Sequence, residues 1–148
     1  MALHPDLRAF IELLNSHRVE YVVVGAHAMA YHGCPRYTGD IDVFLRVSSE
    51  NATRMERSIR AFGFADTGLT AKDFSEAHQV IQLGFPPNRI DLLTSLTGVT
   101  FDDAWAEAVS AELEGLPVRM LSRDHLIANK KALGRAKDFA DLEWLEGQ

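Results

Sequence analysis

Two aspartates separated by one residue are the feature of the sequence with the clearest chemical potential. Asp40 and Asp42 flank Ile41, and the apolar run that they begin continues to Val47. In a strand, residues two apart share a face, so both carboxylates would point the same way while Ile41 points into the core. Carboxylates held side by side repel each other unless a proton or a cation lies between them. The pair therefore predicts a cation site, and Mg²⁺ suits it because this ion prefers oxygen and commonly uses one or two carboxylates with substrate phosphates.

A third aspartate and a glycine add to this prediction. Asp91 lies inside an apolar strand expected at 90–93, and three carboxylates would meet if that strand neighbours the one that carries Asp42. Such a cluster could polarise an incoming hydroxyl and place it in line with a phosphate. Gly25 ends an earlier apolar run, and a residue without a side chain lets the backbone come close to phosphate oxygens. The Asp-Xaa-Asp motif by itself has a plainer alternative, a solvent-facing pair on an edge strand.

Two charged residues fall on the apolar faces of the helices expected at the end of the chain. The apolar stripes consist of Leu126, Ile127 and Leu133 in a helix at 122–133, and of Phe139, Leu142 and Leu145 in a helix at 136–146. Lys130 lies near the middle of the first stripe, and Asp138 lies inside the second. A lone buried charge is unfavourable, so each needs a partner. Lys130 could pair with Asp138 in a structural ion pair, with the aspartate cluster, or with a bound phosphate.

The pattern of apolar residues predicts helices and strands that alternate along the chain. We expect helices at 5–17, 26–32, 49–62, 101–110, 122–133 and 136–146, and strands at 21–24, 41–47, 80–83, 90–93 and 117–121, with 64–76 irregular. The strands at 80–83 and 90–93 form a hairpin around Pro86-Pro87-Asn88. This arrangement predicts an α/β (α+β) fold, a mixed sheet covered by helices. We expect one domain over 1–148, with 122–148 as its closing helical segment.

Composition limits the classes of protein to which the chain can belong. The chain has 148 residues, of which 47% are hydrophobic, and no apolar run approaches the roughly 18 residues that cross a bilayer. A single cysteine and an N-terminus unlike a signal peptide lead us to expect a cytoplasmic protein. The formal net charge of −6 argues against broad binding along nucleic acid. Basic residues nevertheless crowd into 119–137, which leaves a local anionic ligand open.

The residues discussed so far resemble, in order and spacing, the signature of the DNA polymerase β-type nucleotidyltransferase superfamily. That signature is an apolar residue, Gly, then Gly or Ser, a short helix, Asp-apolar-Asp and a later third Asp. In this chain it reads Val24-Gly25-Ala26, Asp40-Ile41-Asp42-Val43 and Ile90-Asp91-Leu92. More narrowly, the chain looks like the minimal prokaryotic nucleotidyltransferases related to abortive-infection toxins. The runs that carry this narrower resemblance are His27-Ala28 to His32-Gly33, Arg36, Thr38, Leu126-Ile127-Ala128-Asn129-Lys130, Gly134-Arg135, Lys137-Asp138 and Asp141-Leu142.

The resemblance implies a polymerase β-like nucleotidyltransferase fold. It also implies transfer of a nucleoside monophosphate from an NTP, with Mg²⁺ or Mn²⁺, to a hydroxyl of a protein, a tRNA or a small molecule. Matched residue by residue, the catalytic metal ligands would be Asp40, Asp42 and Asp91, and Gly25 and Lys130 would contact the nucleotide phosphates. Ala26, Arg36 and Thr38 are further candidate nucleotide contacts, and Arg36 could instead bind the acceptor or be an exposed loop residue.

One position departs from the family pattern and keeps other functions open. Ala26 stands where the superfamily usually has Gly or Ser, which could weaken nucleotide binding or abolish transfer. The first alternative is a non-catalytic module of a toxin–antitoxin-like system that binds a nucleotide or an antitoxin-type partner protein. The second is hydrolysis of a phosphate ester, in which the same carboxylates would act with water as the acceptor in place of a hydroxyl group.

Overall fold

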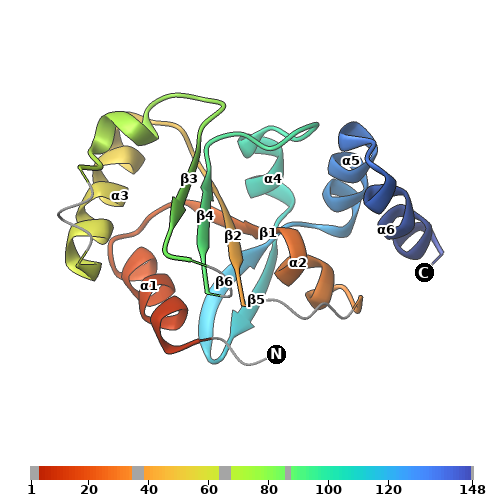
Figure 1. The fold of residues 1–148 in the computed structure, drawn as a ribbon, viewed down its shortest axis with the longest axis horizontal. Helices are drawn as coiled ribbons and strands as arrows, with labels where there is room; N and C mark the ends of the chain where they lie inside the picture. The colour runs from red at the N-terminus through yellow and green to blue at the C-terminus, as the bar shows by residue number, and fades with distance from the viewer. Residues whose placement is uncertain (1–3, 35–38, 64–67, 86–87, 148) are drawn as a thin grey trace.

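The computed structural model describes residues 4–34, 39–63, 68–85 and 88–147. Its helices are α1 (Pro5–Ser16), α2 (Gly25–Tyr31), α3 (Ser49–Phe62), α4 (Phe101–Glu107), α5 (Arg123–Leu133) and α6 (Ala136–Glu146), with a 3-10 helix η2 (Ala71–Phe74). Its strands are β1 (Tyr21–Val24), β2 (Ile41–Leu45), β3 (Val80–Leu83), β4 (Ile90–Leu93), β5 (Val109–Leu113) and β6 (Leu116–Met120). These elements confirm the expected α/β class, with a mixed sheet flanked by helices (Figure 1).

The described strands form one six-stranded sheet in the order β3-β4-β2-β1-β6-β5. β2 runs parallel to β4 and antiparallel to β1, and β1 runs parallel to β6. All four residues of β1 are buried, as expected for a short uninterrupted run of β-branched and aromatic residues in the middle of a sheet. The hairpin of β3 and β4 has the predicted bounds.

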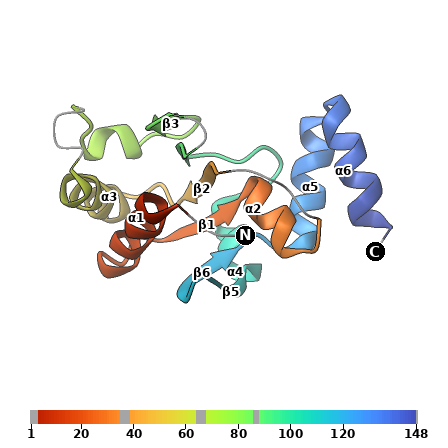
Figure 2. The ribbon, with the colours of Figure 1, turned by 60° about the horizontal axis from the view of Figure 1, so that its bottom comes forward.

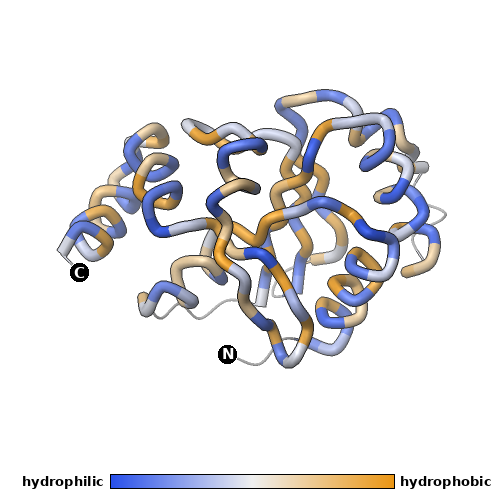
Figure 3. The backbone as a smooth tube through the Cα atoms, turned by 180° about the vertical axis from the view of Figure 1, so that it is seen from behind, coloured by the Kyte–Doolittle hydropathy of each residue, from blue (hydrophilic) through white to orange (hydrophobic). Residues whose placement is uncertain are grey.

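Local signals in the sequence account for most helix ends. The Ser48 hydroxyl accepts a hydrogen bond from the Asn51 amide at the start of α3, and Gly63 ends that helix with a φ of 101°. Asn51 also ties α3 to the sheet, because its side-chain amide donates to the carbonyls of Glu20 and Arg46. Most helices alternate between hydrophobic and hydrophilic residues, which is the pattern of helices that cover a core on one side (Figure 3).

Two of the predicted elements are wrong. The helix expected at 101–110 ends at Glu107, and Val109–Leu113 forms the edge strand β5. The alternation of apolar and polar residues in 109–113 is the period of a strand. Glu114 and Gly115 have φ values of 48° and 83°, the left-handed pair that closes a two-residue hairpin loop. Within the stretch expected to be irregular, the four residues of η2 form a turn of 3-10 helix that buries Phe74.

The two closing helices lie side by side at the opposite end of the molecule from α1 and α3 (Figures 1 and 2). The loop after β4 holds α5 in place, since Asn129 donates a hydrogen bond of 2.9 Å to the Thr97 carbonyl. Gly98 allows this close approach: a Cβ there would lie 2.6 Å from that of Ala132. In the described part of the chain, no helix has the length and apolar character needed to cross a membrane.

Candidate functional site

The sheet brings two of the predicted acidic residues into direct contact. Asp42 on β2 and Asp91 on β4 are register partners on neighbouring parallel strands, which is the adjacency expected from the sequence. Their side chains share a hydrogen bond. Burial, followed by the charge and hydrogen bond of Asp91 and the charge of Asp40, raises the pKa of Asp42 from 3.8 to about 7. A carboxyl group in this state holds a proton near neutrality or requires a cation beside it.

Gly25 has a more specific role than a flexible turn. It adopts a φ of 68°, a left-handed conformation that strains any residue with a side chain. A Cβ at this position would lie 2.1 Å from Oδ2 of Asp42. The absence of a side chain at Gly25 therefore makes room for the Asp42 carboxylate, whereas the sequence had suggested only an approach of the backbone to phosphate.

Asp40 occupies a different position from the other two acids. It precedes β2, its side chain is 25% exposed, and it does not line the cleft that Asp42 and Asp91 line. Its Oδ1 accepts a hydrogen bond of 2.8 Å from the backbone amide of Arg89. The structure thus brings all three predicted aspartates to the N-terminal ends of β2 and β4, with Asp42 and Asp91 in contact and Asp40 to one side.

Arg89 is a site residue that the sequence reasoning missed. Its guanidinium binds Asp91 in a bidentate manner, with Nε 2.7 Å from Oδ1 and Nη2 3.1 Å from Oδ2. The same Nη2 lies 3.9 Å from Oδ2 of Asp40. The signal was present in the sequence, because residues two apart along a strand project to the same face and Arg89 stands two before Asp91.

Asp42 and Asp91 open onto a cleft of about 660 Å³, which the closing helices line with basic residues and with Asp141. This volume lies within the roughly 300–1,000 Å³ typical of small-molecule sites. Gly25, Ala26, Asp42, Arg89 and Asp91 form one side of the cleft. Lys130 of α5, together with Arg135 and Lys137 near the start of α6, lines it from the closing helices. Two further predicted contacts, Arg36 and Thr38, lie outside the described residues.

The Lys130 ammonium is held by two carboxylates of α6. Its Nζ lies 2.9 Å from Asp141 and 3.5 Å from Asp138, so the predicted pairing with Asp138 is present but is the longer of the two contacts. Asp138 is fully buried, and its carboxylate accepts hydrogen bonds from the backbone amide and the guanidinium of Arg135. Those bonds hold the pKa of Asp138 well below its usual range. The predicted stripe of α6 is wrong at Phe139, which is 60% exposed, because the buried face carries these aspartates.

The donor set fits a divalent cation in part. Among the residues that the structure describes, no three Asp, Glu, His or Cys side chains converge as a preformed metal cage. Asp42 and Asp91 nevertheless offer two adjacent carboxylates beside a cleft, and burial together with the neighbouring carboxylates raises the pKa of Asp42. Two carboxylates suffice for Mg²⁺ when phosphates and water complete its coordination. Asp40 does not line this cleft, so it would join them only after its side chain turns toward it.

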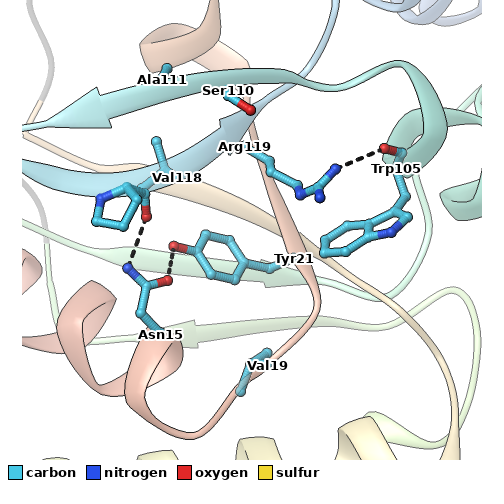
Figure 4. A pocket seen from close by; sticks show the side chains of 9 residues that line it. Asn15, Val19, Tyr21, Trp105, Ser110, Ala111, Val118 and Arg119 are labelled. Atoms are coloured by element: carbon cyan, nitrogen blue, oxygen red, sulfur yellow. Dashed lines mark hydrogen bonds between the residues drawn. The ribbon is translucent and has the colours of Figure 1, made fainter.

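A second cleft, of about 280 Å³, shares no lining residue with the first (Figure 4). Three of its polar side chains, Asn15, Tyr21 and Arg119, take part in hydrogen bonds. The Tyr21 hydroxyl donates to Asn15, the Asn15 amide donates to the Pro117 carbonyl, and Arg119 donates to the Trp105 carbonyl while its guanidinium lies 3.9 Å from the Trp105 ring centroid. These contacts join α1, β1, α4 and β6, so the polar residues of this cleft have a structural explanation.

Ionisation of Asp42 is expected to destabilise the folded chain. With its pKa raised to about 7, the folded chain keeps a proton between about pH 4 and pH 7 that the unfolded chain has released, so the free energy of unfolding falls as pH rises through this window. Below it both states are protonated, and above it both are ionised. Urea unfolding of the wild type and of Asp42→Asn from about pH 5 to about pH 8 measures this. The wild type should lose stability relative to the variant, and a difference independent of pH would contradict the prediction.

Comparison with known proteins identifies the fold. No protein-family model and no curated protein sequence matches the chain. A crystal structure from Thermotoga maritima, described as a "putative nucleotidyltransferase", superimposes with a TM-score of 0.56 at 19% identity, over 99% of this chain and 96% of that one. An antigenic nucleotidyltransferase-like protein from Paracoccidioides brasiliensis gives a TM-score of 0.48 at 12% identity, over 98% of this chain and 78% of that one. The first of these two superpositions shows that the chain shares the fold of the Thermotoga maritima protein.

Proposed function

We propose that this protein is a metal-dependent nucleotidyltransferase that moves a nucleoside monophosphate from an NTP to a hydroxyl group. The observation that carries the proposal is one cleft lined both by the contacting carboxylates of Asp42 and Asp91 and by basic side chains of the closing helices. A triphosphate is an anion that requires cations along its whole length. Lys130, Arg135 and Lys137 can supply part of that charge, and a divalent cation on Asp42 and Asp91 can supply the rest.

In this proposal each residue has a defined task. A bound Mg²⁺ or Mn²⁺ supplies Lewis acidity at the α-phosphate and at the attacking oxygen. Asp42 and Asp91 would hold it, with Asp40 as a further ligand if its side chain turns toward the cleft. The acceptor oxygen forms a bond to the α-phosphorus, the bond to the bridging oxygen breaks, and pyrophosphate leaves. We assign the acceptor proton to Asp91, and Gly25 keeps the space that Asp42 occupies.

A second candidate, a non-catalytic module that binds a nucleotide or a partner protein, is favoured by Ala26. This residue lines the cleft next to Gly25. Its methyl group narrows the approach of a phosphate, and it lacks the hydroxyl that a serine would offer. Such a module could be one half of a toxin–antitoxin-like pair.

Labelled nucleotides distinguish these functions. The protein is incubated with each NTP, labelled at the α- or the γ-phosphate, together with Mg²⁺ or Mn²⁺ and a cell extract. Movement of the α-label but not the γ-label to an acceptor supports nucleotidyl transfer. Metal-dependent binding without transfer identifies the binding module, and conversion of the labelled NTP to free NMP and pyrophosphate, or to NDP and phosphate, identifies hydrolysis. Failure to bind any NTP would contradict both the transferase and the nucleotide-binding module.

Lys130→Ala is expected to weaken NTP binding about tenfold or more, because a charge-assisted contact to phosphate is lost. The matched control is Lys131→Ala, since Lys131 is exposed and pairs with Glu146 at 3.2 Å outside the cleft. Titration calorimetry gives both affinities, and thermal unfolding shows whether the loss of the Asp141 contact has disturbed α6. Equal effects of the two substitutions on affinity would remove Lys130 from the nucleotide site.

A further inference from the structure

We propose that Arg89 is an internal counter-ion which competes with the divalent cation for Asp91 and thereby makes cation binding depend on nucleotide. The inference rests on the proposed function, because it concerns the same carboxylates. It assigns a positioning role to a residue that the signature in the sequence does not include.

The contacts of Arg89 indicate that the guanidinium and a metal ion would weaken each other's binding to Asp91. Its guanidinium covers both oxygens of Asp91, at 2.7 Å and 3.1 Å. A metal ion on Asp91 requires at least one of those oxygens, and it would place a second positive charge within a few ångströms of the guanidinium. Both the shared atoms and the charge repulsion oppose simultaneous binding. Cation binding must therefore move or weaken the Arg89–Asp91 pair.

A nucleotide bound in the cleft would give the displaced Arg89 guanidinium a new partner, a phosphate group. Arg89 lines the cleft, and its side chain is 27% exposed, so the group already borders the space in which a triphosphate would lie. Guanidinium groups bind phosphate through the same bidentate geometry that they use for carboxylates. A phosphate group of the nucleotide can thus replace the Asp91 carboxylate as the partner of the Arg89 guanidinium. Metal and nucleotide should then bind with positive coupling, each increasing the affinity for the other by the same factor.

The test uses Arg89→Met, which removes the charge while keeping an extended side chain. The hydrogen bond from residue 89 to Asp40 comes from the backbone amide, so the substitution leaves that donor in place. Binding of Mn²⁺ is measured directly by electron paramagnetic resonance, with and without the α,β-methylene analogues of ATP, CTP, GTP and UTP. Arg60→Met is the matched control, because Arg60 pairs with Glu56 on the surface of α3.

In the wild type, Mn²⁺ should bind weakly alone and more tightly with an analogue. Arg89→Met should bind Mn²⁺ alone about tenfold more tightly than the wild type, with a smaller increase on adding the analogue. Arg60→Met should behave as the wild type does. Arg89→Lys keeps the charge but loses the bidentate contact, so its affinity for Mn²⁺ alone should lie between those of the wild type and Arg89→Met. If Arg89→Met does not fold, Arg89→Lys provides the comparison with the wild type.

Two results would overturn the proposal, and they differ in what they imply. Unchanged or weaker binding of Mn²⁺ alone by both Arg89 variants, in proteins that still bind Mn²⁺ with nucleotide, removes the competition but leaves the proposed function intact. Absence of Mn²⁺ binding by the wild type under every condition overturns the competition and the metal-dependent function together.

Discussion

Asp42→Asn is expected to reduce nucleotidyl transfer by about a thousandfold or more, since a metal ion supplies several kcal/mol of stabilisation to the transition state. Asparagine has the shape of aspartate but lacks the charge that would hold the cation. Because Asp42 is buried beside Asp91, the same substitution also removes a repulsion between two carboxylates. The variant should therefore unfold at higher urea concentration than the wild type near pH 8 while it loses transfer.

A loss of transfer activity together with a gain in stability is the informative result. It would separate loss of chemistry from loss of fold, which a simple inactive variant cannot do. Asp124→Asn is a suitable control, because Asp124 is an exposed residue in the first turn of α5 and does not line the cleft. Transfer by Asp42→Asn within a few-fold of the wild type would remove Asp42 from the metal site.

Gly25→Ala is the second substitution for which a large effect is expected. Its left-handed backbone alone costs an alanine about 1–2 kcal/mol. In addition, the new methyl group would lie 2.1 Å from the carboxylate of Asp42, so the carboxylate has to move. We expect a lower midpoint of thermal unfolding, weaker Mn²⁺ binding in the presence of nucleotide, and little remaining transfer.

The control for this substitution is Gly115→Ala in the turn between β5 and β6. Gly115 has a φ of 83°, and no atom lies within 4 Å of the position that a methyl group would take there. Alanine at this position therefore meets a similar backbone strain without a clash. Both variants should lose stability, but only Gly25→Ala should lose metal and nucleotide binding. If Gly115→Ala impaired binding equally, the effect of Gly25→Ala would reflect general destabilisation and not contact with Asp42.

Most helices and strands could be predicted from the sequence because their signals are local. The buried strand Tyr21–Val24 and the capped helix Ser49–Phe62 are examples, each bounded by a glycine or serine in the expected place. The strand Val109–Leu113 was missed because it follows an acidic helix directly. The turn that identifies it, Glu114-Gly115, lacks the Asn or Asp that usually accompanies glycine there.

The same distinction applies to the site. The sequence by itself determined which residue types were available for cation and phosphate chemistry: aspartates spaced along apolar strands, a glycine before a short helix, and a lysine on an apolar helix face. Only the tertiary structure decided their partners, because those depend on strand order and helix packing. It placed Asp42 beside Asp91, set Arg89 on Asp91, and gave Lys130 the carboxylate of Asp141. The spacing of residues along a strand or helix determines which face of that element a side chain occupies. Which side chains meet across two elements depends on contacts between residues that are far apart in sequence.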